Sequence, residues 1–264
     1  MRRQGVIQDK GTFVLGMAMG VVAVGSLILF CLFLAGYSPN SKPHVCPIPY
    51  TETHPDFTKM VNSSVRIEVT DALAKGGSLG SGTVIRKTSD AMYILTCAHV
   101  VGGEDWESAE PDPLMMTYIV KYTLNGRQKV HTRVEVIKYD GKVDLAIIKV
   151  TGTDDNLEIA KISDTDAIQG DTVYAVGNPL GYERILSKGI ISSLREKGFI
   201  IYDGLTTFGN SGGGLYNSVG ELIGVPEQVP VYPILGGLLG AVPESNLGNS
   251  VDTKTIREFV KDLK

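Results

Sequence analysis

The chain has 264 residues, enough for one catalytic unit of two packed subdomains plus an appendage and too few for a string of independent domains. Its formal net charge of −4 excludes a strongly basic surface, so no nucleic acid is expected as a partner. Three cysteines are too few for a disulfide-built scaffold, although a bridge between Cys46 and Cys97 is left open. The cysteines and four scattered histidines show no metal-ligand spacing, so neither a metal nor another cofactor is expected.

The N-terminal segment is predicted to cross a membrane. Residues 11–36 are almost wholly apolar, and no charged residue occurs between Gly11 and Ser41. A helix of this length measures about 39 Å, enough to span a bilayer with some tilt. The apolar core of a cleavable secretory signal is shorter than this segment, although Ala35 and Gly36 supply small residues where a peptidase could cut. An uncleaved anchor is therefore favoured over a cleaved signal.

Basic residues predict the orientation of this anchor. Three of them precede it within residues 1–10, whereas only Lys42 follows closely. The positive-inside bias therefore predicts a cytoplasmic tail over residues 1–10, a transmembrane signal anchor in the lipid bilayer over residues 11–36, and an extracytoplasmic body. Residues 37–60 are expected to form a spacer, because their five prolines suit neither a helix nor a paired strand.

Beyond the spacer, short runs of β-branched and aromatic residues separated by turn signals predict an all-β body. The first series predicts a six-stranded antiparallel β-barrel within residues 61–150. Its strands are expected at residues 61–70, 82–86, 92–96, 115–123, 130–138 and 145–150.

A polar stretch at residues 151–156 separates this series from a second one, which predicts another six-stranded antiparallel barrel within residues 160–245. The strands of the second barrel are expected at residues 172–176, 185–194, 199–202, 214–216, 221–225 and 238–242. A helix is predicted over residues 252–263, because apolar residues recur there at helical spacing behind an acceptable cap.

The most informative string is Gly-Asn-Ser-Gly-Gly-Gly at residues 209–214. A serine among glycines suits a nucleophile, because backbone N–H groups must closely approach the anion formed at a substrate carbonyl, and a side chain at Gly209 would obstruct them. A serine hydroxyl is a poor nucleophile without a base and an orienting carboxylate. Ser211 therefore needs partners elsewhere in the chain.

His99 and Asp144 are the candidates for those partners. His99 follows an apolar strand, although a histidine after a strand, taken alone, is more often structural. Asp144 opens a strongly apolar strand, whereas its competitor Asp140 precedes a glycine and is typical of a turn. The spacing assigns the histidine and the aspartate to the first barrel and the serine to the second, which predicts a site in the cleft between them.

The strings Thr-Cys-Ala-His, Asp-Leu-Ala and Gly-Asn-Ser-Gly-Gly, in this order, resemble the trypsin-like serine peptidases, and most closely their HtrA (Deg) branch. The likeness covers residues 61–263 and includes Gly-Ser-Gly-Thr-Val, Val-Gly-Asn-Pro-Leu-Gly and Gly-Glu-Leu-Ile-Gly-Val. It implies a peptidase domain with two chymotrypsin-like barrels. The implied roles are His99 as general base and then acid, Asp144 as its orienter, Ser211 as nucleophile, and the amides of Gly209 and Ser211 as the oxyanion hole.

The resemblance also implies the substrate contacts. Leu205 would lie near the floor of the specificity pocket and disfavour lysine or arginine before the cut, unless it belongs to the core. Val225 ends the string Gly-Glu-Leu-Ile-Gly-Val, and the strand after this string should pair with the backbone of the substrate. Pro226 and Pro230 lack an N–H and are therefore expected to weaken or shift that pairing. Secreted digestive members carry an aspartate at the position of residue 210, and that aspartate pairs with the new N-terminus made by propeptide cleavage. This chain has Asn210 there, and an amide cannot form the ion pair, so activation by propeptide cleavage is not expected.

These features together predict a membrane-anchored serine endopeptidase that cleaves extracytoplasmic proteins or peptides. HtrA proteins commonly carry PDZ domains after the protease; this chain stops after one helix, so none is expected. The alternative is a catalytically silent relative that uses the same cleft as a peptide-binding or chaperone module, and an esterase is a weaker third option. A homo-oligomer is left open.

Overall fold

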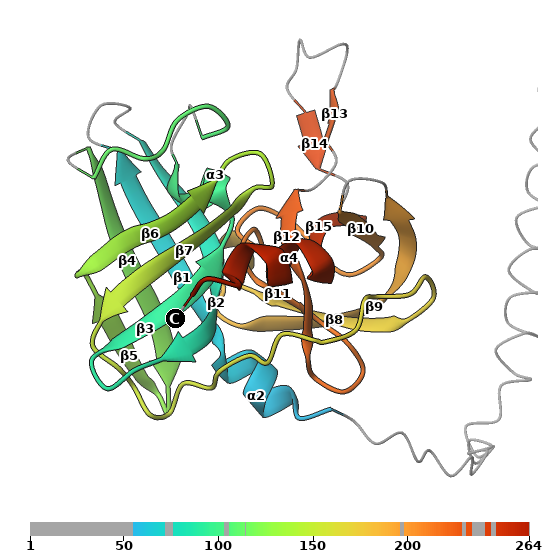
Figure 1. Ribbon diagram of the computed structural model, residues 1–264, viewed down its shortest axis with the longest axis horizontal. Coiled ribbons are helices and arrows are strands. Elements are labelled where there is room, and N and C mark those ends of the chain that lie inside the picture. The colour runs from blue at the N-terminus through green and yellow to red at the C-terminus, as the bar shows by residue number, and fades with distance from the viewer. Residues whose placement is uncertain are drawn as a thin grey trace, which may run out of the picture. The chain divides into compact units, whose positions relative to one another are not determined.

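In the computed structural model, antiparallel strands dominate the described part of the chain (Figure 1). The structure describes residues 55–71, 76–102, 106–113, 115–195, 198–228, 231–233, 241–243 and 247–263. The predicted cytoplasmic tail, the transmembrane anchor and most of the spacer lie outside these residues. Among the described residues, no helix is both long and apolar enough to cross a membrane.

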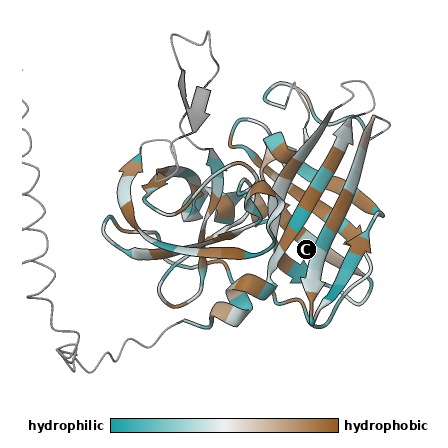
Figure 2. Ribbon diagram, turned by 180° about the vertical axis from the view of Figure 1, so that it is seen from behind, coloured by the Kyte–Doolittle hydropathy of each residue, from teal (hydrophilic) through white to brown (hydrophobic). Residues whose placement is uncertain are grey.

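Seven strands form the first sheet, in the order β5-β4-β1-β2-β3-β7-β6. The strands are β1 (Ser64–Asp71), β2 (Gly76–Lys87), β3 (Ala91–Thr96), β4 (Met116–Leu124), β5 (Arg127–His131), β6 (Val134–Asp140) and β7 (Leu145–Thr151). Every neighbouring pair is antiparallel. Hydrophobic and hydrophilic residues alternate along several of these strands, which is the pattern of a sheet with one face on the core (Figure 2).

The prediction of a six-stranded first barrel is wrong. The single strand expected at residues 130–138 is two strands, because the chain leaves the ladder at Thr132 and Arg133, which are exposed. On one side of this break β5 pairs with β4, and on the other β6 pairs with β7. The sheet therefore has seven strands, with β5 and β6 at its two ends.

Six strands close the second barrel, in the order β10-β15-β12-β11-β8-β9. The strands are β8 (Thr172–Gly177), β9 (Ile185–Arg195), β10 (Phe199–Tyr202), β11 (Gly214–Tyr216), β12 (Leu222–Gln228) and β15 (Gly248–Asp252). The second barrel has six strands, as predicted, but its last strand is not the predicted one. The strand expected at residues 238–242 is instead β14 (Ala241–Pro243), which pairs with β13 (Val231–Pro233) in a separate ribbon (Figure 1). The barrel is completed by β15, beyond the predicted limit at residue 245.

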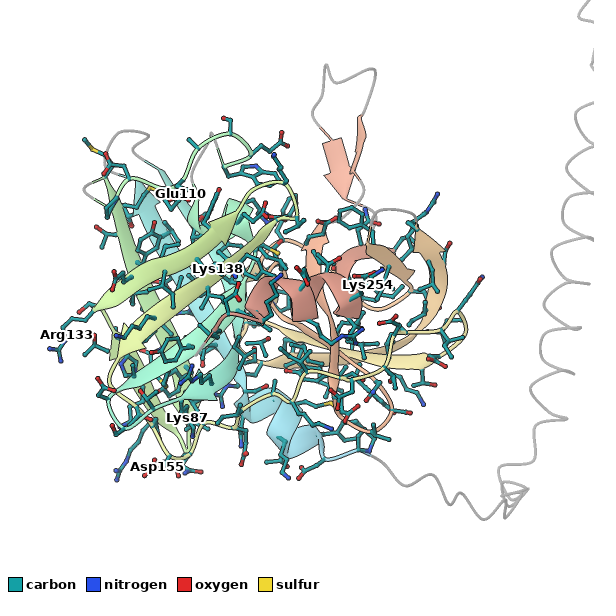
Figure 3. The ribbon with its side chains drawn as sticks, viewed as in Figure 1. Lys87, Glu110, Arg133, Lys138, Asp155 and Lys254 are labelled. Carbon is teal, nitrogen blue, oxygen red and sulfur yellow. The ribbon has the colours of Figure 1, made fainter. Side chains whose placement is uncertain are left out.

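The predicted C-terminal helix is present as α4 (Thr253–Val260), shorter than residues 252–263. Its residues Ile256 and Phe259 are buried. Lys138 of β6 reaches this helix, and its ammonium group lies 5.0 Å from the centre of the Phe259 ring (Figure 3). Three shorter elements were not predicted: α2 (Phe57–Asn62), α3 (Ala98–Val101) and the 3₁₀ helix η1 (Pro179–Gly181).

We expect Asp252→Ala to lower the free energy of unfolding by about 1 kcal/mol. The Asp252 carboxylate accepts a hydrogen bond from the Thr255 backbone N–H at 2.8 Å and so caps the first turn of α4. Urea unfolding of the variant beside Lys254→Ala checks this, because Lys254 lies in the same turn with its side chain exposed (Figure 3). Equal midpoints for the two variants would contradict the capping role.

One hydrophobic cluster extends from the first sheet into the second barrel. It joins residues such as Ile147 of β7 to Val225 of β12, Val251 of β15 and Phe259 of α4. The second barrel also has a small core of its own, which includes Ile200. Because the shared cluster fixes the sheet against the barrel, side chains from both can meet at a common site.

Candidate active site

A histidine and an aspartate from the first sheet are hydrogen-bonded to each other. His99 lies on α3, directly after β3, and Asp144 ends the turn before β7. One carboxylate oxygen, Asp144 Oδ2, lies 2.7 Å from His99 Nδ1, and the other accepts a hydrogen bond from the His99 backbone N–H at 2.9 Å. This double contact fixes both the ring and its backbone. It favours the tautomer that is protonated on Nδ1 and leaves Nε2 as a proton acceptor.

The backbone of Asp144 has a φ of 52°, in the left-handed region that aspartate tolerates better than most residues. The carboxylate is buried, with 6% of the residue exposed. Asp140, the competing candidate, instead accepts a hydrogen bond from the Lys142 backbone N–H at 2.9 Å within the same turn. The structure thus places Asp144 at the histidine and Asp140 at the end of β6.

Two further side chains surround His99. The Trp106 ring meets the imidazole edge to face, with 5.7 Å between ring centres. Cys97 is a free, buried thiol that donates a hydrogen bond to the Pro226 carbonyl oxygen at 3.2 Å, and Cys46, the other half of the bridge left open by the sequence, lies outside the described residues. The Trp106 ring thus packs on a histidine whose side chain is 28% exposed.

Metal binding at this cluster is disfavoured by the state of the thiol. Potential ligand atoms of Cys97, His99 and Asp144 lie within 4.8 Å of one another. Burial raises the pKa of the Cys97 thiol well above its usual value, and the charge of Asp144 adds to the rise. A thiol that stays protonated at neutral pH is a poor ligand, because metals bind the thiolate. The absence of a metal stays a prediction.

The candidate nucleophile comes from the second barrel, in the loop between β10 and β11. Ser81 of β2 in the first sheet anchors this loop through two hydrogen bonds. Its backbone N–H donates to the Ser211 carbonyl oxygen at 2.8 Å, and its hydroxyl donates to the Gly209 carbonyl oxygen at 2.6 Å. The first sheet therefore holds the serine loop as well as the histidine and the aspartate.

Two backbone amides in this loop are free to bind an anion. Within the described part of the chain, neither the Gly209 N–H nor the Ser211 N–H donates to a protein acceptor. Gly209 has a φ of 94°, and a Cβ atom there would lie 2.7 Å from the Asn178 carbonyl oxygen. Glycine is thus required by both the backbone conformation and the close approach.

Gly209→Ala is expected to lower kcat by roughly 10²- to 10³-fold, the effect of losing one donor to the oxyanion. The added methyl group would displace the 209 peptide and with it the amide. Steady-state hydrolysis of a peptide substrate measures the loss, and circular dichroism shows whether the fold survives. A folded variant with unchanged kcat would exclude this amide from the reaction.

The Ser211 hydroxyl is not bonded to the histidine. Ser211 Oγ donates to the Glu227 carbonyl oxygen at 2.9 Å. Among the residues that the structure describes, no hydrogen bond joins it to His99. A proton transfer from Ser211 to His99 would require this hydroxyl to rotate toward His99 Nε2, and such contacts commonly tighten only when substrate is bound.

The predicted substrate contacts differ in their exposure. Leu205 is 50% exposed, so it is not a core residue. Val225 has no exposed surface, because it belongs to the core cluster, and in this structure it offers nothing to a substrate. β12 continues through Pro226, whose carbonyl oxygen accepts a hydrogen bond from the Gly212 N–H at 2.8 Å. Pro230 and most of the segment after it lie outside the described residues.

Asn210 makes an internal contact near the site. Its side-chain amide donates to the Leu205 carbonyl oxygen at 3.5 Å, and the residue is buried. A neutral amide at this position needs no positively charged N-terminus beside it, so independence from propeptide cleavage stays a prediction.

The sequence interpretation missed Ser81, Trp106 and Glu227. Ser81 lies within a string that was noted only for its resemblance. Glu227 is the most unusual of the three, because the pKa of its carboxyl group is raised to about 7: burial and then the charge of Asp144 raise it, and His99 lowers it. An acidic residue at the end of an apolar strand, two positions after Val225, is the signal that could have drawn notice.

A histidine held by an aspartate, beside a glycine-flanked serine on an adjoining β-barrel, is the arrangement of a serine peptidase site. The trypsin-like peptidase domain family matches residues 80–225, more than half of the chain. The chain therefore belongs to this family.

Its similar proteins are HtrA-like serine proteases. The "Serine protease HtrA-like" of Staphylococcus aureus (strain USA300) is 28% identical over 242 residues, which cover 81% of this chain and 28% of that protein. The "Probable periplasmic serine endoprotease DegP-like" of Marinomonas sp. (strain MWYL1) is 32% identical over 186 residues, or 66% of this chain and 35% of that protein. The chain thus spans roughly a third or less of the length of these curated relatives.

Solved structures show the same fold. The crystal structure of the serine endoprotease from Yersinia pestis has a TM-score of 0.55 and 27% identity, and the match covers 78% of this chain and 65% of that chain. A variant of the HtrA-type protease AlgW with a tripeptide has a TM-score of 0.56, at 24% identity, over 78% of this chain and 61% of that chain, and it supports the fold alone.

Proposed function

We propose that this chain is a membrane-anchored serine endopeptidase that cleaves extracytoplasmic proteins or peptides through a Ser-His-Asp triad. The observation that carries the proposal is the pair of hydrogen bonds from Asp144 to the ring and backbone of His99. Such an aspartate orients a base, and a base is useful only beside a group that it can deprotonate. Ser211, whose loop is bonded to the same sheet through Ser81, is that group.

In the acylation step, Ser211 Oγ attacks the carbonyl carbon of the scissile bond while His99 Nε2 takes the hydroxyl proton. The negative charge that develops on the carbonyl oxygen is stabilised by the N–H groups of Gly209 and Ser211. Asp144 stays ionised and stabilises the imidazolium. The C–N bond then breaks, His99 gives its proton to the leaving amine, and an ester joins Ser211 to the acyl half of the substrate.

In the deacylation step, water replaces the amine. His99 removes a proton from the water, the hydroxide attacks the ester carbonyl, and the same two amides stabilise the second oxyanion. Collapse of this intermediate returns the proton to Ser211 Oγ and releases the new carboxyl terminus. The cycle uses side chains and amides of this chain and one water molecule.

The alternative function is a catalytically silent relative that binds peptides in the same site. The hydrogen bond from the Ser211 hydroxyl to the Glu227 carbonyl oxygen favours it, because the hydroxyl is turned away from the base. A mixed peptide library incubated with the full-length protein and read by mass spectrometry separates the two. Internal cleavage with new carboxyl termini supports the peptidase, whereas retention of intact peptides supports the binding module.

The same library tests the proposed preference for an aliphatic residue before the cut. Leu205 and Phe208, both in the nucleophile loop, are exposed apolar side chains that a substrate can reach. Cleavage after leucine, isoleucine or valine is expected to exceed cleavage after lysine or arginine. The reverse ranking would remove Leu205 from the specificity pocket.

The membrane anchor is supported by the uncharged, apolar run at residues 11–36 and the basic residues before it. Full-length protein is expected to stay with membranes washed in alkaline carbonate, and a chain that lacks residues 1–36 is expected to be released. External protease should digest the body in intact cells or spheroplasts. Release of the full-length chain by carbonate would contradict the anchor.

A further inference from the structure

We propose that Asn178 is a positioning residue of the oxyanion hole: through the Ser81 hydroxyl and the turn η1, it fixes the two peptide groups on either side of Gly209. The kinetic consequence of this inference rests on the proposed function. Its effect on the backbone around Gly209 does not, because the hydrogen bonds concerned are made in the resting chain.

The direction of the Gly209 N–H is not fixed by the residue itself. Gly209 has a φ of 94°, and glycine adopts positive and negative φ about equally readily. Rotation of the peptide group between Phe208 and Gly209 would turn the N–H away from a bound carbonyl group at little cost to the local backbone. A contact from outside the residue is therefore needed to keep this amide available to an oxyanion.

The turn η1 holds the first of the two peptide groups. The Leu180 backbone N–H donates to the Phe208 carbonyl oxygen at 2.8 Å. In a trans peptide the C=O and the next N–H point in opposite directions, so this bond directs the Gly209 N–H away from η1. Leu180 makes the bond with a φ of 53°, a left-handed conformation that leucine rarely adopts and that its surroundings must enforce.

Asn178, the residue before η1, fixes this turn against the first sheet. It has no exposed surface. Its Oδ1 accepts a hydrogen bond from the Arg184 backbone N–H at 3.0 Å, which closes the turn, and its Nδ2 donates to the Val65 carbonyl oxygen of β1 at 2.9 Å. The far end of the turn is tied to the same sheet, because Arg184 Nη1 donates to the Thr123 carbonyl oxygen at 2.9 Å.

The second peptide group is held by the Ser81 hydroxyl, and Asn178 sets the orientation of that hydroxyl. Ser81 Oγ accepts hydrogen bonds from the Asn178 backbone N–H at 2.8 Å and from Asn178 Nδ2 at 3.1 Å. A hydroxyl oxygen has two lone pairs and one hydrogen. Both acceptor positions of Ser81 are thus occupied, and its hydrogen is left for the Gly209 carbonyl oxygen, 2.6 Å away.

The test compares Asn178→Ala with Asn217→Ala in the detergent-solubilised full chain. Asn217 closes the turn between β11 and β12, where its Oδ1 accepts hydrogen bonds from the Val219 and Glu221 backbone N–H groups. Among the described residues, no hydrogen bond joins this turn to the nucleophile loop between β10 and β11. The control therefore loses a turn-closing asparagine of the same barrel and leaves the contacts of Gly209 in place.

The first readout is the affinity for a peptide aldehyde beside that for the corresponding peptide alcohol. Ser211 Oγ adds to the aldehyde carbon, and the former carbonyl oxygen becomes the oxygen of a tetrahedral hemiacetal in the oxyanion hole, whereas the alcohol forms no adduct. We expect Asn178→Ala to weaken aldehyde binding by roughly 10- to 100-fold and alcohol binding by less than about twofold, with kcat lowered by the same factor as aldehyde binding at an unchanged KM. A merely structural role would lower the amount of folded protein and leave both affinities unchanged.

The second readout needs no substrate: it is hydrogen exchange over residues 178–184, measured by mass spectrometry. The backbone N–H groups of Asn178, Leu180 and Arg184 are all hydrogen-bonded in this segment. Asn178→Ala is expected to speed exchange there by at least about tenfold, because the turn loses its closing contact, and Asn217→Ala should leave the rate within about twofold.

The two readouts separate this inference from the proposed function. If the wild-type chain neither cleaves peptides nor binds the aldehyde, but exchange is faster in Asn178→Ala, the endopeptidase fails and the hold of Asn178 on the backbone at Gly209 stands. Unchanged exchange would overturn the proposal. So would an unchanged aldehyde affinity in a folded Asn178→Ala variant of a chain that cleaves peptides.

Ser81→Ala takes the place of Asn178→Ala if the latter does not fold. It removes the hydroxyl that donates to Gly209, so the same loss of aldehyde affinity is expected. Ser63→Ala is its control, because Ser63 is also buried and its hydroxyl donates to the Met60 carbonyl oxygen at 2.8 Å instead of to the nucleophile loop. Equal aldehyde affinities in the two serine variants, or equal exchange over residues 178–184 if the chain is inactive, would overturn the proposal.

Discussion

Replacing Ser211 with alanine is expected to lower kcat by roughly 10⁵- to 10⁶-fold. The variant keeps the two backbone amides and the His99–Asp144 pair but loses the atom that forms the acyl-enzyme. Binding of peptide should change little, because the hydroxyl contributes to the reacting atoms and not to the specificity pocket. Hydrolysis of an internally quenched peptide by the purified full chain measures the loss.

Ser218→Ala is the matched control for this substitution. Ser218 lies in the exposed turn between β11 and β12 and is expected to tolerate alanine with unchanged kcat. Cleavage that persists in Ser211→Ala at the wild-type rate would assign the activity to another residue or to a contaminant. Equal losses in both serine variants would indicate damage to the fold instead.

Asp144→Asn is expected to lower kcat by about 10⁴-fold near neutral pH. Asparagine tolerates the left-handed backbone conformation at this position, so the fold should survive. An amide, however, can present an N–H to His99 Nδ1, which favours the wrong tautomer and does not stabilise the imidazolium. The rate of a single turnover on an ester substrate isolates this effect from substrate binding.

Asp140→Asn provides the comparison, because Asp140 ends β6 directly before the turn that contains Asp144. Asp140 accepts a backbone hydrogen bond from Lys142, a contact that an asparagine oxygen can also make. The kcat of Asp140→Asn is expected to stay within about twofold of the wild-type value. A large loss in Asp140→Asn, or full activity in Asp144→Asn, would contradict the assignment of the carboxylate.

The candidate residues of the site could be selected from the sequence because short strings carry them. His99 follows an apolar strand, Asp144 opens one, and glycines flank Ser211, so local pattern was enough to select them. The fold brings the first two of these side chains within 2.7 Å of each other. Glu227 was not predicted, because the raised pKa of its carboxyl group depends on burial among residues far away in sequence. No local sequence pattern shows such burial.

The fold was less predictable at its strand boundaries. The break at Thr132 and Arg133 lies inside a run with high β-propensity, and propensity does not show where a strand changes partners. The last strand of the second barrel was placed too early because residues 238–242 are apolar, whereas β15 contains Gly248 and Asn249 and is weak by composition. Despite this composition, β15 pairs with β10 and β12 and so becomes the strand that completes the barrel.

The most direct test of the proposed nucleophile is to label the full-length, uncleaved protein with a serine-directed fluorophosphonate and map the adduct by peptide mass spectrometry. We expect one adduct on Ser211, formed without prior processing of the chain and slowed strongly in Asp144→Asn. No adduct on the wild-type chain, or an adduct on a different serine, would contradict it.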